Sequence, residues 1–290
     1  MFFSMSGKTQ LIWNCRGREV DCSERTLVMG ILNATPDSFS DGGEFLNAER
    51  ALARALQMVE EGADVIDIGG ESTRPGAEPV PASEEIERTV PIIGKLREQS
   101  DVFISIDTQK AEVARAAMAA GADMINDVSA LGDPQMAAVA AETGAGLVLM
   151  HMLGSPRTMQ NNPQYNDVVS NVRSFLEERM ALAVRQGVAE AQIVLDPGIG
   201  FGKTDEHNLA LLNGIPELAA AGRPVLIGAS RKSLFGRLLG REVDDRLAGS
   251  LAVAVFSVMC GAHILRVHDV KESCDAIGLV DKLRIQGTHE

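Results

Sequence analysis

The sequence predicts an α/β protein, a (β/α)8 TIM barrel in a single domain preceded by a short N-terminal hairpin. From residue 26 onward, short runs rich in Val and Ile alternate with longer stretches of helical spacing, and glycine marks most junctions. Runs that are apolar throughout indicate parallel strands covered on both faces, which leaves an open doubly wound sheet or a closed barrel. Eight complete units with no segment left over favour the barrel.

The expected elements follow one another in strict alternation. Several helices should end at a glycine, the residue that most readily adopts a left-handed C-cap; these are Gly62, Gly121, Gly144, Gly187 and Gly222. We expect strands at 27–32, 65–68, 102–106, 124–126, 147–150, 193–195, 225–227 and 264–267. We expect helices at 47–61, 83–99, 110–120, 134–143, 166–186, 205–221, 244–260 and 270–286, and a shorter one at 232–239.

Residues 1–25 form an N-terminal extension outside the repeat, and residues 26–286 form the expected barrel domain. Within the extension, a turn-like stretch at 16–18 is flanked by residues 11–13 and 19–20. This pattern favours a small hairpin that caps the bottom of the barrel.

Composition narrows the functional classes. Hydrophobic residues make up 45% of the 290 residues and charged residues 23%, the balance of a folded globular protein. The formal net charge of −13 argues against a nucleic-acid or anionic-membrane binder. The four cysteines do not form a CxxC motif, and no stretch resembles a signal peptide or a membrane span, so we expect a cytoplasmic protein.

Polar residues stand at the end of nearly every expected strand. In a barrel of this kind the loops after the strands build the site, so these residues should converge on one mouth. Any single one could equally be a helix cap or turn residue, but the whole set favours a site. They are Asn33, Asp67, the loop 71–74, Asp107, Asn126, Asp127, His151, Asp196, Ser230, Arg231, Lys232, Arg266 and His268.

Charges at this mouth indicate the kind of ligand. Asp107 and Asp196 each end an apolar strand, so both should lie deep, where a ligand with several N–H groups would compensate their desolvation. Clustered Arg and Lys suit a phosphate or carboxylate, although ion pairs with surface acids would also explain them. This expected basic island consists of Arg74, Lys203, Arg231, Lys232 and Arg266.

Two further patterns are ambiguous. Residues 197–204 resemble a phosphate-binding P-loop, but Pro197 replaces the first required glycine. The loops at 35–43 and 73–76 could close over a substrate as lids, or could be ordinary mobile surface loops.

Taken together, the motifs resemble those of the dihydropteroate synthases, a family of pterin-binding enzymes. The similarity runs from residue 30 to 270 in the family's order and departs from it at Leu153, where glutamine is more usual. The matching stretches are 30–33, 35–43, 67–76, 105–108, 125–127, 149–152, 195–198, Ser230-Arg231-Lys232-Ser233 and Arg266-Val267-His268-Asp269-Val270.

The resemblance implies condensation of 6-hydroxymethyl-7,8-dihydropterin diphosphate with 4-aminobenzoate, which gives dihydropteroate and diphosphate in folate synthesis, with Mg²⁺ assisting. It assigns the pterin to Asp107, Asn126, Met150, Asp196 and Lys232, and the diphosphate to Asn33, Thr73, Arg74, Arg266 and His268. It assigns 4-aminobenzoate to Thr73, Arg74, Pro75, Phe201, Lys232 and Ser233, and the metal to Asn33 and Asp37. The implied catalytic residues are Asn33, Lys232, Arg266 and His268.

The charge pattern suits an SN1-like route, in which cations stabilise the departing diphosphate and the buried carboxylates favour a pterin methylene cation. One alternative is a pterin-binding methyltransferase that serves a corrinoid partner, which should lack the runs at 230–232 and 266–270. The other is a non-catalytic relative, in which the site residues should be eroded.

The family also implies a homodimer that binds its small-molecule substrates without nucleic acid or membrane. An apolar stripe in the expected helix 244–260 would suit the dimer interface, although core packing explains the stripe equally well. The stripe is Leu247, Leu251, Val255 and Val258.

Overall fold

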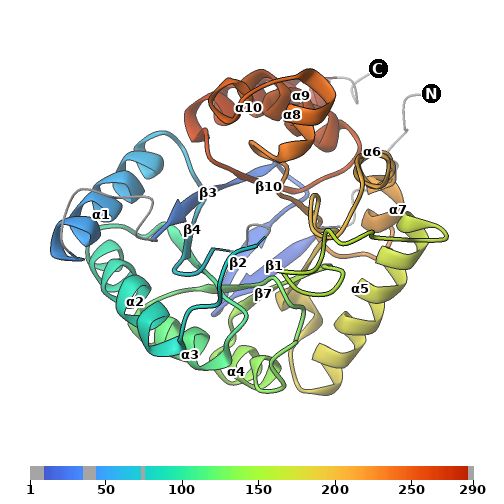
Figure 1. Ribbon diagram of the computed structural model, residues 1–290. Helices are drawn as coiled ribbons and strands as arrows, with labels where there is room; N and C mark the ends of the chain where they lie inside the picture. Colours follow the sequence, from blue (N-terminus) through green and yellow to red (C-terminus); the bar gives the residue numbers. More distant parts are fainter. Residues whose placement is uncertain (1–9, 35–43, 73–75, 287–290) are drawn as a thin grey trace.

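Eight parallel strands form the core of the protein. The computed structural model describes residues 10–34, 44–72 and 76–286. The strand order in the sheet is β8-β7-β6-β5-β4-β3-β10-β9, and a parallel bridge from Leu195 to Val225 joins its two edges. The predicted barrel is therefore confirmed (Figure 1). The strands are β3 (Leu27–Asn33), β4 (Val65–Gly69), β5 (Phe103–Asp107), β6 (Met124–Asp127), β7 (Gly146–Met150), β8 (Ile193–Asp196), β9 (Leu226–Ile227) and β10 (Ile264–Val267).

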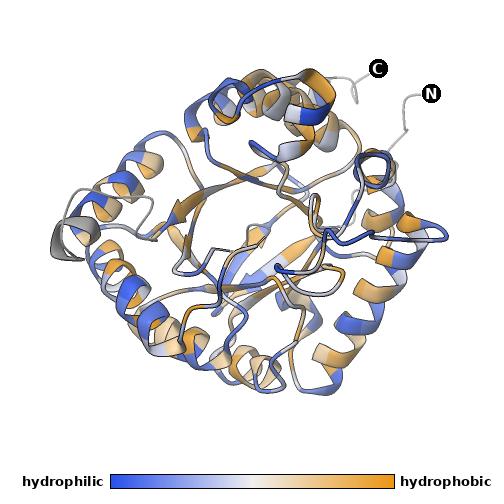
Figure 2. Cartoon of the chain, viewed as in Figure 1, coloured by the Kyte–Doolittle hydropathy of each residue, from blue (hydrophilic) through white to orange (hydrophobic). Residues whose placement is uncertain are grey.

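The helices surround the sheet and turn their apolar sides toward it (Figure 2). None of the described helices is both long and apolar enough to cross a membrane. The helices are α1 (Glu44–Glu60), α2 (Ala82–Gln99), α3 (Ala111–Ala120), α4 (Met136–Thr143), α5 (Val168–Arg185), α6 (Asp205–Asn213), α7 (Ile215–Ala219), α8 (Ser233–Leu239), α9 (Leu247–Met259) and α10 (Val270–Gln286).

Two predicted helices differ from the structure. The stretch expected as one helix at 205–221 is divided into α6 and α7 at Gly214, because Pro216 has no N–H to continue the backbone ladder. The helix expected from 244 begins at Leu247, after a separate 3-10 turn at Val243–Asp245.

Side chains along each strand alternate between the barrel interior and the helical layer. In β4, Val65 packs inside the barrel, whereas Ile66 and Ile68 pack against the helices. The lower part of the interior is apolar and includes Leu27, Met29, Val65, Met124, Val148, Val194, Leu226 and Ile264. The next inward positions, nearer the carboxyl ends of the strands, are largely polar.

The predicted hairpin is present and closes the bottom of the barrel. Strands β1 (Ile12–Cys15) and β2 (Arg18–Asp21) pair antiparallel, and both turn residues, Arg16 and Gly17, have positive φ, as a type I′ turn requires. Trp13 is fully buried in the lower apolar layer, and its Nε1 donates to the carbonyl oxygen of Gln192 at 2.8 Å. The boundary between residues 25 and 26 stays a prediction.

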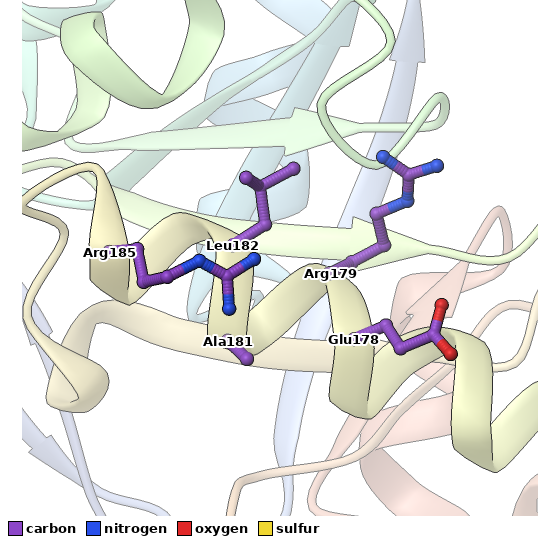
Figure 3. Close-up of a pocket in the computed structure, with 5 residues that line it drawn as sticks. All are labelled: Glu178, Arg179, Ala181, Leu182 and Arg185. Atoms are coloured by element: carbon purple, nitrogen blue, oxygen red, sulfur yellow. The ribbon is translucent and has the colours of Figure 1, made fainter.

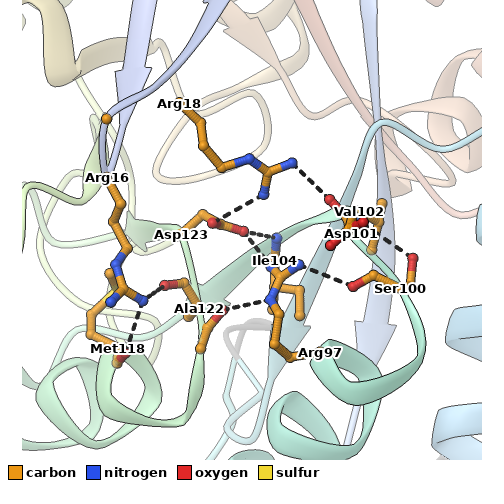
Figure 4. A network of polar contacts seen from close by, with 12 residues as sticks. Arg16, Arg18, Arg97, Ser100, Asp101, Val102, Ile104, Met118, Ala122 and Asp123 are labelled. Atoms are coloured by element: carbon orange, nitrogen blue, oxygen red, sulfur yellow. Dashed lines mark hydrogen bonds and ion pairs between the residues drawn. The ribbon is translucent and has the colours of Figure 1, made fainter.

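Polar contacts also hold the hairpin to the barrel (Figure 4). Asp123 precedes β6, and its two carboxylate oxygens accept from Arg18 of the hairpin at 3.2 Å and from Arg97 of α2 at 2.6 Å. The Asp123 carboxylate also accepts from the backbone N–H of Ile104 at 2.9 Å. The guanidinium of Arg18 lies 3.7 Å from the ring centroid of Phe103.

Removal of the Trp13 side chain should destabilise the barrel strongly. Trp13→Ala would leave a cavity beneath the interior layer and should lower the free energy of unfolding by about 3–5 kcal/mol in a urea titration. Glu19→Ala, a substitution at an exposed position of the same hairpin, is the control and should change the free energy of unfolding little. Equal effects of the two changes would mean that the hairpin does not seal the core.

Candidate functional site

The polar upper layer of the interior places the candidate site at the carboxyl ends of the strands. The alternation that points Val65 inward also points Asp67 inward, and Asp107, Asn126 and Asp196 occupy equivalent positions on β5, β6 and β8. All four side chains are buried, with residue exposures of 8% or less.

Arg266 joins two of these carboxylates. From β10, its Nε donates to Oδ2 of Asp67 and its Nη2 to Oδ2 of Asp107, each at 2.6 Å. The Nδ2 of Asn126 donates to the same Asp67 oxygen at 3.1 Å. Burial alone would lower the pKa of Arg266, but Asp67 and Asp107 outweigh it and raise that pKa, so the guanidinium is charged.

Several buried polar atoms at this place have no hydrogen-bond partner among the described residues. They are Oδ1 of Asp67, Oγ of Ser105, Oδ1 of Asp107 and Oδ1 of Asn126. An unsatisfied buried polar group costs about 1–3 kcal/mol, so such a cluster needs an explanation. A ligand that offers several N–H donors would satisfy the oxygens of Asp107 and Asn126.

Burial changes the acidity of the two strand-end carboxylates. Desolvation raises the pKa of Asp107 to about 7, although Arg266 opposes the rise. Desolvation likewise raises the pKa of Asp196 to about 6, against the hydrogen bond from the Gly198 N–H at 2.7 Å. Both carboxylates are therefore harder to ionise than an exposed aspartate.

Lys232 and the loop after β8 lie together at one side of the site. The Nζ of Lys232 stands 4.0 Å from the ring centroid of Phe201, which is a cation–π geometry. A Cβ at Gly200 would come within 3.3 Å of Cδ of Lys232, so glycine allows this close packing. Ser233 follows at the start of α8, where its Oγ accepts from Arg237 at 2.9 Å.

His268 is held in a neutral form at the end of β10. Desolvation and, after it, the nearby Arg266 lower its pKa to about 3. Its Nδ1 lies 3.1 Å from Oγ of Ser230, and the same Oγ accepts the His268 backbone N–H. When Ser230 donates to Nδ1, Nε2 carries the ring hydrogen and can donate to a ligand.

Two strand-end residues that we expected at the mouth point the other way. Asp127 follows the inward Asn126 and so faces outward, where it accepts from Ser129 and Leu131 and shapes the next loop. His151 follows the inward Met150 and packs edge-on against Phe175 of α5, with 4.9 Å between ring centroids. Alternation along the strand explains both corrections.

The predicted basic island is also smaller than expected. Arg231 forms an ion pair with Asp269 on the protein surface. Lys203 lies 1% exposed beneath the loop after β8. Its Nζ donates to the carbonyl oxygens of Gly198 and Phe201, each at 2.9 Å, and lies 3.0 Å from Nδ1 of His151. Lys203 therefore supports the loop from below rather than presenting a charge to a ligand.

The remaining predicted residues are only partly described. Asn33 ends β3 and is partly exposed, and Met150 ends β7 with 3% exposure. Asp37, Thr73, Arg74 and Pro75 lie outside the described residues.

Sequence reasoning missed a cluster that ties two loops together. Lys110 donates to Glu71 and to the fully buried Glu85, each at 2.6 Å, while the other Glu71 oxygen accepts from the Val80 N–H at 3.0 Å. The cluster fixes both flanks of the loop between β4 and α2. Its residues show no shared motif in the sequence, because three separate segments supply them.

A separate hollow of about 420 Å³ lies on α5, away from the strand ends. Its five lining residues all come from that helix and include Glu178, Arg179 and Arg185 (Figure 3). Binding sites usually draw convergent polar groups from several elements, so this surface is not the candidate site.

Comparison with known proteins agrees with this geometry. Residues 29–268 match the family described as pterin binding enzyme. A dihydropteroate synthase of Synechocystis is 51% identical over 265 residues, which cover 91% of this chain and 92% of that protein. The chain belongs to the dihydropteroate synthase family.

Solved structures of that family superpose closely on the barrel. Dihydropteroate synthase of Xanthomonas albilineans with 4-aminobenzoic acid has a TM-score of 0.89 and 46% identity, covering 95% of this chain and 99% of that one. The same organism's enzyme in complex with 7,8-dihydropteroate has a TM-score of 0.86 and 44% identity, covering 94% and 98%. The similarity therefore includes the strand ends that carry the candidate site.

The buried Lys203 should make stability depend on pH. Burial lowers its pKa from 10.5 to about 7, so between these values the unfolded chain binds more protons than the folded chain. The free energy of unfolding should therefore rise with pH relative to the Lys203→Met variant, by roughly 1 kcal/mol per pH unit.

Urea titrations of both proteins at about pH 7.5 and about pH 9.5 would measure this difference. Lys282→Met, a change of an exposed lysine on α10, is the matched control and should show no such trend. A pH-independent difference for Lys203→Met would contradict the assignment.

Proposed function

We propose that the protein condenses 6-hydroxymethyl-7,8-dihydropterin diphosphate with 4-aminobenzoate to form 7,8-dihydropteroate and diphosphate in folate synthesis. The observation that carries the proposal is the buried group of acceptor oxygens on Asp107, Asn126 and Asp196, held beside Arg266 and Lys232. Related enzymes were solved with 4-aminobenzoic acid and with 7,8-dihydropteroate, which match one proposed substrate and the product.

The pterin ring is assigned to the upper layer of the interior. Its aminopyrimidinone edge offers several N–H donors, which suit the free oxygens of Asp107 and Asn126 and the carboxylate of Asp196. Met150 would line the same pocket, and Lys232 would donate to the acceptor side of the ring. A bound ring would therefore supply the donors that the buried oxygens need.

Diphosphate is assigned to the rim formed by Asn33, Arg266 and His268, with Thr73 and Arg74 from the next loop. The low pKa of His268 means that its Nε2–H would act as a neutral hydrogen-bond donor and not as a cation. Arg266 would supply the positive charge, although Asp67 and Asp107 already compensate part of it. Together these groups would stabilise the leaving group as the carbon–oxygen bond breaks.

Mg²⁺ is the proposed cofactor, with Asn33 and Asp37 as its protein contacts. The described residues contain no group of three or more His, Cys, Asp or Glu that could hold a metal. Mg²⁺ commonly uses one or two protein oxygens together with substrate phosphates, and the amide oxygen of Asn33 is of that kind. When bound, the ion would neutralise charge on the departing diphosphate.

4-Aminobenzoate is assigned to the side of the site that carries Phe201, Lys232 and Ser233. Thr73, Arg74 and Pro75, which lie outside the described residues, are assigned to the same substrate. The Phe201 ring offers an apolar surface, and Lys232 above it offers a positive charge near the aromatic acid. The attacking nitrogen has a free lone pair at neutral pH, so positioning would matter more than a general base. The buried carboxylates would favour an SN1-like cation at the pterin methylene.

The two alternatives have less support. The chain carries the runs at 230–232 and 266–270, which are not expected in a methyltransferase that serves a corrinoid partner. A non-catalytic relative should have lost site residues, whereas Asn33, Lys232, Arg266 and His268 are all present.

One assay tests the proposed function directly. The purified protein is mixed with dihydropterin diphosphate, Mg²⁺ and labelled 4-aminobenzoate, and labelled dihydropteroate should form. A chain that binds the pterin but forms no product under saturating conditions would support the non-catalytic alternative.

Lys232→Ala should lower turnover in this assay by more than tenfold while the fold stays intact by circular dichroism. The variant removes the cation that connects the proposed pterin and aminobenzoate positions. Lys95→Ala on α2 is the matched control and should turn over normally. Near-normal activity of Lys232→Ala would remove this residue from the proposed site.

A cytoplasmic homodimer is the proposed state of the protein. All four cysteines are free thiols, which suits a reducing compartment. On α9, Phe256 and Met259 lie three positions apart on one side of the helix, with exposures of 42% and 56%. Of the predicted stripe, Val258 is buried in the core and Leu247 lies on another side of the helix. An exposed apolar face of this kind is typical of a surface that another subunit covers.

Phe256→Asp should weaken the proposed dimer by placing a charge on this face. Sedimentation velocity should show twice the monomer mass for the wild type and a larger monomer fraction for the variant. Leu209→Asp, an equally exposed apolar residue on α6, is the control and should leave the mass unchanged. A monomeric wild type would contradict the dimer.

A further inference from the structure

Asp67 has no role in the site as proposed so far, although it lies at the centre of the site's contacts. It is fully buried inside β4, and its Oδ2 accepts from Arg266 at 2.6 Å and from Asn126 at 3.1 Å. In the strand register Asp67 pairs with Ser105, whereas Asp107 pairs with Gly69. Asp67 therefore lies one inward level below Asp107, deeper in the barrel.

The contact with Asn126 determines which way its carboxamide faces. A carboxylate oxygen that already takes a guanidinium hydrogen offers only a lone pair, so the group that faces it must be the amide nitrogen of Asn126. The Asn126 oxygen is then turned away from Asp67, and it is buried without a partner among the described residues. Asp67 thus makes Asn126 an acceptor toward the mouth.

The contact with Arg266 has a second consequence. Arg266 divides its donors between two carboxylates, with Nε on the deeper Asp67 and Nη2 on Asp107. A ligand N–H can bind the free Oδ1 of Asp107 while Nη2 keeps its bond to Oδ2. The Nε bond to Asp67 would hold the guanidinium beside Asp107 as the ligand binds.

We propose that Asp67 is a positioning residue that determines specificity for the pterin: it fixes Asn126 as an acceptor of a ligand N–H and anchors Arg266 beside Asp107. The proposal rests on the proposed function for the identity of the ligand. Asp67 acts through Asn126 and Arg266 and does not itself touch the substrate.

The first test is Asp67→Leu, which keeps the approximate size of the side chain and removes the oxygen that accepts from both Arg266 and Asn126. The Asn126 amide and the Arg266 guanidinium are then no longer held in one orientation. The KM for dihydropterin diphosphate should rise at least tenfold, while the KM for 4-aminobenzoate should change less than twofold. Asp244→Asn, an exposed change, is the matched control and should leave both values unchanged.

The second test is Asp67→Asn, in which the carboxylate charge is lost but an oxygen is kept. Because Nε of Arg266 is always a donor, the new amide oxygen should take the place of Oδ2 and should again accept from Asn126. The KM of Asp67→Asn for dihydropterin diphosphate should rise at most threefold. A loss in Asp67→Asn as large as in Asp67→Leu would mean that the acceptor does not position Asn126.

Calorimetric titration with 6-hydroxymethylpterin measures the same effects without turnover. Wild-type binding without product formation would reject the proposed function and leave the Asp67 comparison intact. An unchanged pterin affinity in Asp67→Leu, equal losses for both substrates, or an Asp67→Asn no better than Asp67→Leu would each overturn the proposal. A folded Asp67→Leu that loses pterin selectively, with most of the affinity kept in Asp67→Asn, is the expected result.

Discussion

The alternation of side chains along eight short parallel strands is the constraint on which the site depends. Every second residue of a strand faces the closed interior, so only one or two positions per strand can reach the mouth. Asp67 and Val65 on β4 share one face, and Asn126 and Met124 on β6 share another. The polar layer and the apolar layer below it are therefore successive inward positions of the same strands.

The two layers have opposite requirements. The lower one excludes water with Trp13 and the strand residues that surround it. Because the lower layer excludes water, the ionised forms of the carboxylates above it are poorly solvated. Desolvation accordingly raises the pKa values of Asp107 and Asp196. Arg266 compensates Asp67 and Asp107, but no described residue donates to the second oxygen of Asp107 or to the oxygen of Asn126. A site built this way is completed only by a ligand that carries several N–H groups.

Alternation also explains how much of the site the sequence could predict. The strands and the barrel were predictable because apolar runs and glycine junctions are local signals. Asp127 and His151 were misplaced because strands that are buried on both faces are apolar at every position. The sequence of such a strand does not show which of its two alternating sets of side chains faces the barrel interior. Lys203 was misplaced for another reason: only the fold shows that a loop covers it and that backbone carbonyls surround its amine.

The chain's acidity raises a final question about anion recognition. Two anionic substrates are proposed for a protein with a net charge of −13, and the described part of the mouth offers Lys232 and Arg266 as cations. Arg266 is already matched by two carboxylates, and the low pKa of His268 leaves its ring neutral. Long-range attraction is then weak, and binding must rely on short hydrogen bonds in fixed directions. That dependence on direction is why a buried residue that only orients its neighbours, such as Asp67, can influence which ligand is accepted.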